Sequence, residues 1–238
     1  MPSLAARHVE AEVLDHLAPQ DSRARASRRD LSRINTLMFA PRILARLLSR
    51  HAPEPPRRIL EIGCGDGRMS LALAGRLARR WPGVALTLLD QQAGLVTDQT
   101  RAAFSALGWE VDVVSADAFD YLAGNPPHFD IALANLVLHH FEDEMLARLL
   151  AGLGRHAALV VAAEPLRRPF ALAASRTLAV IGANDVTRHD APASVRAGFR
   201  TGELGALWPA TFGPVLEDRA CGPFSHVFAA SGEARREP

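Results

Sequence analysis

The sequence contains no lysine, so all 27 of its basic residues are arginines. This excludes Schiff-base chemistry and a P-loop phosphate site, because both depend on a lysine amine. The two cysteines, Cys64 and Cys221, are too few for a disulfide framework or a zinc site, and we predict no metal. The sequence also lacks a signal-peptide pattern and any apolar run of about 18 residues. We therefore expect a cytoplasmic protein that does not contact membranes.

An excess of charge of either sign is also missing. The 27 basic residues face 26 acidic ones, which leaves a net charge of +1. Nucleic-acid binders rely on an excess of cations that neutralise phosphates, so we expect no nucleic-acid partner. The 238 residues, 48% of them hydrophobic, suit one large α/β domain or a domain with a small cap.

Residues 1–54 are predicted to form an N-terminal helical cap. Ala5–Leu17 carries apolar residues at helical spacing, and Pro41 stands at the start of a second helical stretch. The polar residues 21–30 between them indicate a linker or a solvated helix face. The proline-rich residues 51–56 then mark a break before the next element.

From residue 55 to 238 the pattern alternates between strands and helices, which predicts a doubly wound α/β domain with a parallel sheet. Residues 167–200 interrupt the alternation, so we expect an insertion there that forms a lid. A closing antiparallel pair follows near the end of the chain. The predicted strands are Arg58–Ile62, Val84–Leu89, Glu110–Val114, Phe129–Leu136, Ala157–Ala163, Val215–Ala220 and Phe224–Ala230.

The most informative segment is Glu61-Ile-Gly-Cys-Gly-Asp-Gly67, between a predicted strand and a helix. Such a turn brings backbone N–H groups and a helix N-terminus together beside a ligand. Its glycines are spaced G-x-G-x-G rather than the G-x-G-x-x-G of dinucleotide sites. Glu61 would repel a pyrophosphate but would hold an ammonium group. Asp90 can accept ribose hydroxyls, and Asp117 an adenine amino group, so the pattern indicates S-adenosylmethionine (SAM).

With these motifs the chain resembles the class I SAM-dependent methyltransferases, over residues 55–165 and through the C-terminal pair. The resemblance implies a Rossmann-like, seven-stranded sheet and SAM as cofactor, with S-adenosylhomocysteine as product. It places the methionine part at the glycine loop, the ribose at Asp90, and the α-amino group at backbone carbonyls after strand four. The cofactor residues it implies are Glu61, Gly63, Cys64, Gly65, Gly67, Asp90, Gln91, Asp117, Ala118, Asn135 and Leu136.

Three histidines are candidate catalytic residues, because a hydroxyl acceptor gains from losing its proton during attack. His139 and His140 follow strand four at the carboxyl edge of the sheet, where ligands bind in such folds. His189 lies in the predicted lid. Alternatively, His140 caps the following helix, and the segment around His189 is a solvated loop.

We therefore predict an enzyme that methylates the hydroxyl of a small molecule, a phenol or similar secondary metabolite, as a monomer or homodimer. The alternatives are C- or N-methylation and a non-catalytic SAM-fold binding protein. Residues 125–128, Asn-Pro-Pro-His, resemble a motif of amino-methylating nucleic-acid enzymes. They precede strand four instead of following it, so we interpret them as a turn.

Overall fold

Seven strands form one mixed sheet in the computed structural model, which describes residues 4–233. The strand order is β3-β2-β1-β4-β5-β7-β6, with β1 to β5 parallel and β7 antiparallel to both of its neighbours. This confirms the predicted doubly wound α/β fold with a mixed edge. The strands are β1 (Arg58–Ile62), β2 (Ala85–Asp90), β3 (Glu110–Ser115), β4 (Phe129–Asn135), β5 (Ala157–Pro165), β6 (Val215–Cys221) and β7 (Ser225–Ser231).

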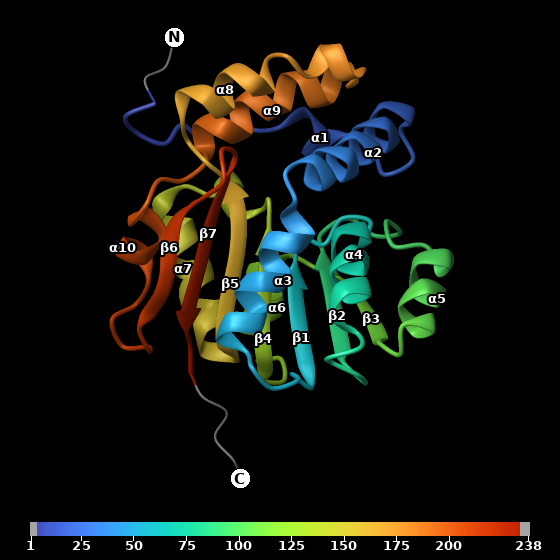
Figure 1. Ribbon diagram of the computed structural model, residues 1–238, viewed down its shortest axis with the longest axis vertical. Helices are drawn as coiled ribbons and strands as arrows, with labels where there is room; N and C mark the ends of the chain where they lie inside the picture. Colours follow the sequence, from blue (N-terminus) through green and yellow to red (C-terminus); the bar gives the residue numbers. More distant parts are fainter. Residues whose placement is uncertain (1–3, 234–238) are drawn as a thin grey trace.

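Helices cover both faces of the sheet, as Figure 1 shows. On one face lie α3 (Ala40–His51), α4 (Arg68–Leu77) and α5 (Asp98–Ala106). On the other lie α6 (Ala118–Ala123), α7 (Asp143–His156) and α10 (Glu203–Leu207). The central strands are therefore buried on both sides, which explains their nearly continuous apolar sequences.

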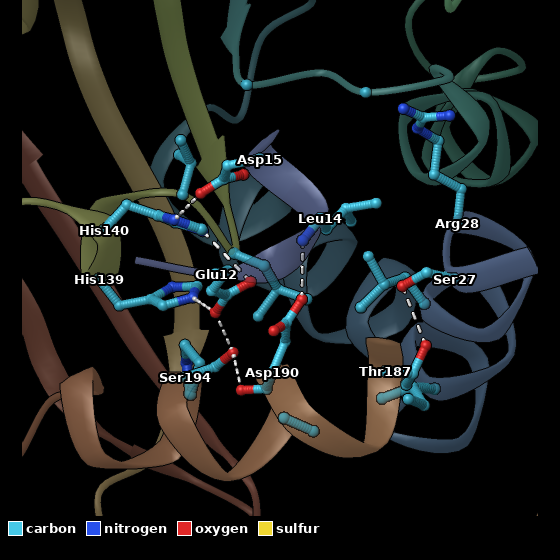
Figure 2. A pocket seen from close by; sticks show the side chains of 18 of the residues that line it. Glu12, Leu14, Asp15, Ser27, Arg28, His139, His140, Thr187, Asp190 and Ser194 are labelled. Carbon is cyan, nitrogen blue, oxygen red and sulfur yellow. Dashed lines mark hydrogen bonds and ion pairs between the residues drawn. The ribbon is translucent and has the colours of Figure 1, made fainter. Parts of the chain in front are cut away.

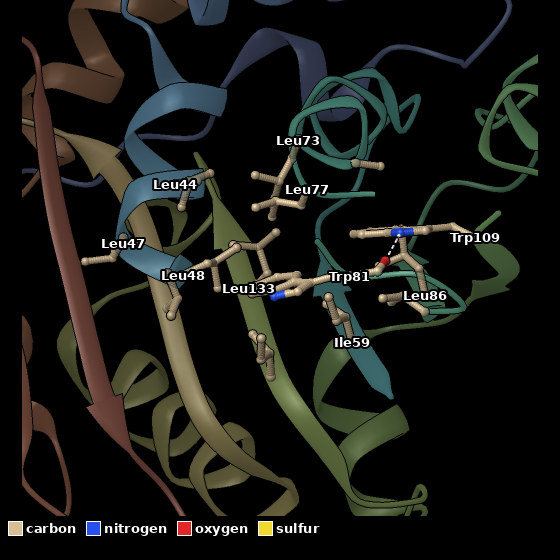
Figure 3. Close-up of a cluster of buried hydrophobic side chains, with 14 of the residues drawn as sticks. Leu44, Leu47, Leu48, Ile59, Leu73, Leu77, Trp81, Leu86, Trp109 and Leu133 are labelled. Carbon is tan, nitrogen blue, oxygen red and sulfur yellow. Dashed lines mark hydrogen bonds between the residues drawn. The ribbon is translucent and has the colours of Figure 1, made fainter. Parts of the chain in front are cut away.

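The core on the α3–α5 side contains two tryptophans (Figure 3). Trp81 and Trp109 are both buried, and the Trp109 indole N–H donates to the Trp81 carbonyl at 2.9 Å. Leu44, Leu47 and Leu48 of α3 pack into the same core. Although we predicted α3 as part of an N-terminal cap, it contributes to the layer that covers the sheet.

Two parts of the chain that are distant in sequence lie together above the carboxyl ends of the parallel strands (Figure 1). One holds α1 (Val13–His16) and α2 (Ser22–Leu37), and the other holds α8 (Pro169–Ser175), the 3-10 helix η2 (Leu178–Ile181) and α9 (Asp185–Ala197). We call this assembly the cap. A buried hydrogen bond of 2.9 Å between the hydroxyls of Ser27 and Thr187 joins its two parts.

The N-terminal segment departs from the prediction. A helix over Ala5–Leu17 was wrong for residues 5–12, since the helix spans only Val13–His16. Tertiary hydrogen bonds hold this segment in an irregular, non-helical form, including His8 N–H to the Arg196 carbonyl at 3.2 Å. Residues 21–30 belong largely to α2, with Asp21 as its N-cap. Among residues 4–233, every helix is too short or too polar to cross a membrane.

Candidate active site

A cavity of about 490 Å³ lies between the cap and the carboxyl edge of the sheet. The chain reverses its direction of strand addition between β1 and β4, and open α/β sheets bind ligands at this switch point. A smaller cavity of about 140 Å³ adjoins it and shares Arg28, Leu31, Gly63, Gly65 and Leu136 with it. The two cavities together run from the glycine loop to the cap.

The glycine loop after β1 needs its glycines for conformation and for space. Gly63, Gly65 and Gly67 have φ values of 61°, 55° and 73°, in the left-handed region that side chains disfavour. A Cβ on Gly63 would lie 2.6 Å from a Val137 methyl, whereas one on Gly65 would have no atom within 4 Å. Gly65 thus borders open space in both cavities, as a residue beside a ligand would.

Two carboxylates face the large cavity from the ends of β2 and β3. Asp90 accepts the backbone N–H of Gly65 at 2.8 Å and that of Gln92 at 2.9 Å, one on each oxygen. Asp117 caps α6, and both of its hydrogen bonds go to Oδ1. Gln91 and Ala118 also line this cavity. Each carboxylate keeps acceptor capacity for hydroxyl or amino groups of a ligand.

The smaller cavity contains two buried polar atoms without a partner, Glu61 Oε2 and Asn135 Oδ1. Burial raises the pKa of Glu61 to about 8. Leu136 adopts a left-handed φ of 55° and lines both cavities. Unpaired acceptors at such a depth are costly, so they suit a cationic ligand group such as an α-ammonium. The residues present therefore fit the methionine end of SAM.

The two remaining loop residues have simpler environments. Cys64 is buried and lines the smaller cavity, and burial raises the pKa of its thiol far above the ordinary value, so it is not a reactive thiolate. Gly67 is the N-cap of α4, and a Cβ there would lie 3.2 Å from Leu88. Gly67 lines neither of these cavities.

His139 and His140 occupy the 3-10 helix η1 (Leu138–His140), and both line the large cavity. Figure 2 shows their rings directed toward Glu12, which comes from the N-terminal segment. His139 Nδ1 lies 2.7 Å from Glu164 Oε2, and His140 Nδ1 lies 3.0 Å from Asp15 Oδ2. We call Glu12, Asp15, His139, His140 and Glu164 the His–carboxylate cluster.

Electrostatics within this cluster keep its buried members charged. Burial lowers the pKa of His139, but hydrogen bonds to Glu12 and Glu164 outweigh it and raise the pKa to about 9. Burial likewise raises the pKa of Glu12, but the two imidazoles and Ser194 bring it down to about 2. His139 is thus protonated at neutral pH when nothing else is bound, so it does not act as a proton acceptor in that state.

The other candidate histidine lies outside the cavity. His189 is on α9, its side chain is 63% exposed, and its Nδ1 lies 2.9 Å from Asp190 Oδ1. Asp190 lines the cavity and His189 does not. His140 does not cap α7 either, because Glu142 holds that position.

Sequence reasoning missed the acidic residues of the cluster. Glu12 and Asp15 belong to no motif and lie more than a hundred residues from the histidines. Glu164 could have been found, because it stands near the end of a predicted strand, at the edge where ligands bind.

The sequence of this chain is similar to those of known methyltransferases. A methyltransferase domain model matches residues 60–158. The chain is 34% identical over 113 residues to the ribosomal RNA small subunit methyltransferase C of an Enterobacter species. That alignment covers 46% of this chain and 31% of the relative, so the chain spans less than a third of the relative's length.

Solved structures share the fold over a larger part of the chain. An O-methyltransferase family protein from Burkholderia thailandensis matches with a TM-score of 0.63 and 16% identity, covering 91% of this chain and 62% of that one. A plantazolicin methyltransferase bound to S-adenosylhomocysteine matches with a TM-score of 0.61 and 13% identity, covering 90% and 92%. The matched domain, the glycine loop and the sheet order support the resemblance of this chain to the class I SAM-dependent methyltransferases.

Proposed function

We propose that this protein transfers a methyl group from SAM to the hydroxyl of an apolar small molecule such as a phenol. One observation carries the proposal: a single cavity is bounded by the glycine loop, an apolar cap and the His–carboxylate cluster. The three parts correspond to the three needs of such a reaction, which are a cofactor site, an acceptor site and a group that handles a proton.

The cofactor would lie along the carboxyl ends of β1, β2 and β4. Gly63 and Gly65 leave room for its methionine part, and Glu61 is placed to pair with the α-ammonium group. Asp90 would hold the ribose hydroxyls, and Asp117 would lie at the adenine edge. SAM supplies a methyl group on a sulfonium, which an acceptor oxygen takes as its proton leaves.

The cap supplies the acceptor site. Its side of the cavity is lined mainly by apolar side chains, which favour an apolar or aromatic acceptor and exclude water from the transfer. Because α2 and α9 converge over the cavity, they would also hold the acceptor in line with the methyl group. The apolar residues with which the cap lines the cavity include Leu14, Leu31, Ile34, Leu37, Met38, Leu178 and Val195.

His140 is placed to act on the acceptor proton. Its side chain is 22% exposed, it lines the cavity, and its Nδ1 faces Asp15. A carboxylate on one imidazole nitrogen orients the other toward the cavity and strengthens it as a base. His139 lies deeper, where it links Glu12 to Glu164. We assign His139 a positioning role and His140 the role nearest the acceptor.

A labelling experiment tests the function directly. The protein is incubated with methyl-labelled SAM and a panel of phenols, and the products are analysed by NMR and mass spectrometry. We expect label on phenolic oxygen. Label on carbon or nitrogen would establish the alternative specificity, and transfer to ribosomal RNA alone would contradict a small-molecule acceptor.

The Asp90→Ala variant tests the ribose site. Charge-assisted hydrogen bonds contribute about 1.5–3 kcal/mol each, so loss of the carboxylate should raise the dissociation constant for SAM at least tenfold. Isothermal titration calorimetry measures this constant, and circular dichroism checks that the fold survives. Asp112→Ala serves as a control, because Asp112 is on neighbouring β3 and lines neither cavity. An unchanged constant in Asp90→Ala would mean that the ribose is held elsewhere.

The pH dependence of SAM binding tests the role of Glu61. With a pKa of about 8, Glu61 is mostly protonated at pH 6 and must lose its proton to pair with an ammonium group. Affinity should therefore rise with pH, by about tenfold per unit between pH 6 and 7 if one proton is released. In Glu61→Gln this slope should disappear. A slope that is the same in both proteins would assign the proton to another group.

A further inference from the structure

The His–carboxylate cluster brings three metal-binding donors to one point. Ligand atoms of Glu12, His139 and His140 all lie within 4.8 Å of one another. His139 Nε2 is 3.4 Å from Glu12 Oε1, and His140 Nε2 is 3.9 Å from Glu12 Oε2. Two donors bound to Zn²⁺ at about 2.0–2.1 Å in tetrahedral geometry lie about 3.3 Å apart. We propose that Glu12, His139 and His140 bind a divalent transition-metal ion of the Zn²⁺ type.

The surroundings of both histidines support this assignment. Metal-binding histidines usually donate their second N–H to a carboxylate, which fixes the ring and directs the other nitrogen toward the ion. Here Glu164 faces Nδ1 of His139 at 2.7 Å, and Asp15 faces Nδ1 of His140 at 3.0 Å. Glu164 is itself held by the backbone N–H groups of Val137 and Leu138. Both Nε2 atoms therefore point toward Glu12 (Figure 2).

The charge and the donor types indicate the class of ion. Glu12, Asp15 and Glu164 are three carboxylates around two imidazoles, so neutral imidazoles would leave negative charge to balance a dication. Two nitrogen donors and one carboxylate suit Zn²⁺, Fe²⁺, Co²⁺ or Ni²⁺, whereas Mg²⁺ and Ca²⁺ prefer oxygen donors alone. We predicted no metal because the sequence has only two cysteines, and that prediction left Glu12, His139 and His140 out of account.

The position of the cluster would allow a bound ion to take part in the proposed methyl transfer. Three protein ligands leave at least one coordination position free, as in catalytic zinc sites. All three ligands line the cavity that the cap closes, so a free position would face the acceptor. With His140 Nε2 bound to the ion, the ion would replace His140 in activating the acceptor, because it would bind the acceptor oxygen and favour its deprotonated form. Only this use rests on the proposed function, because metal binding itself does not require it.

Metal titration of the whole protein tests the inference. The protein is stripped with a chelator, then titrated with Zn²⁺ in competition with a chromophoric chelator and with Co²⁺ followed by visible absorption. We expect one equivalent of each ion to bind and Zn²⁺ to raise the melting temperature. Loss of a ligand in His140→Ala or Glu12→Gln should weaken Zn²⁺ binding at least 100-fold. Asp15→Asn, which removes only the carboxylate facing Nδ1 of His140, should weaken it about 10–100-fold.

The control is His189→Ala, which removes an exposed histidine of the cap that lines no part of the cavity. It should bind Zn²⁺ like the wild type. Failure of the wild type to bind one equivalent, or equal binding by the wild type and a correctly folded His140→Ala, would overturn the inference. SAM affinity, measured by calorimetry on the same stripped samples, reports separately on the proposed function.

Discussion

Gly65→Val is expected to abolish SAM binding while the protein remains folded. A Cβ at Gly65 meets no protein atom within 4 Å, so the added side chain would project into the space assigned to the cofactor. The left-handed φ of 55° adds a strain of about 1–2 kcal/mol for a residue with a Cβ. We expect SAM affinity to fall more than 100-fold in calorimetry and the melting temperature to change modestly.

Gly83→Val is the matched control for this strain. Gly83 has a φ of 68°, also meets no atom within 4 Å, and lines neither cavity. It should lose a similar amount of stability and keep its SAM affinity. If Gly65→Val bound SAM as well as Gly83→Val does, the cofactor would have to bind away from this loop.

His140→Ala is expected to lower turnover by about 10²–10⁴-fold and to leave SAM affinity unchanged. The residue lines the part of the cavity proposed to hold the acceptor, and the sequence motifs of the cofactor site do not include it. The deficit should shrink as the pH rises, because a phenol with a pKa of about 10 increasingly ionises without help. Initial rates between pH 6 and 10, measured with saturating SAM, provide the test.

His189→Ala again serves as the control, with rates expected to match the wild type at every pH. Near-native turnover of His140→Ala across the pH range would show that the acceptor needs no proton removed at this position. C- or N-methylation would then explain the cavity better than O-methylation.

The sheet was predictable because each of its strands carries a local signal. Five apolar runs alternate with helical segments and form β1 to β5. Residues 215–231 contain two further runs that form β6 and β7, with Gly222 and Pro223 in the turn between them. The cofactor loop was predictable for a related reason. Its glycines and acidic residues are contiguous, so their spacing alone distinguishes it from a dinucleotide site.

The His–carboxylate cluster was only partly predictable, because tertiary contacts assemble it. His139 and His140 could be placed at the sheet edge, but nothing near Glu12 in the sequence marks it as their partner. The periodicity of residues 5–12 indicates a helix, yet the segment is irregular and forms hydrogen bonds to α9 instead. The position of His189 was also not predictable from the sequence. In the structure its neighbour Asp190 lines the cavity, and His189 does not.

The two-part cap has a consequence for how this protein can diverge in evolution. Much of the wall of the large cavity comes from residues 12–38 and 171–195, and both stretches lie outside the matched methyltransferase domain at 60–158. Mutations in these stretches can reshape the part of the cavity proposed to hold the acceptor without touching the glycine loop, Asp90 or Asp117. Under the proposed function, substrate range and cofactor use can therefore evolve separately in this chain. Close relatives that share the domain but differ in the cap are expected to methylate different compounds.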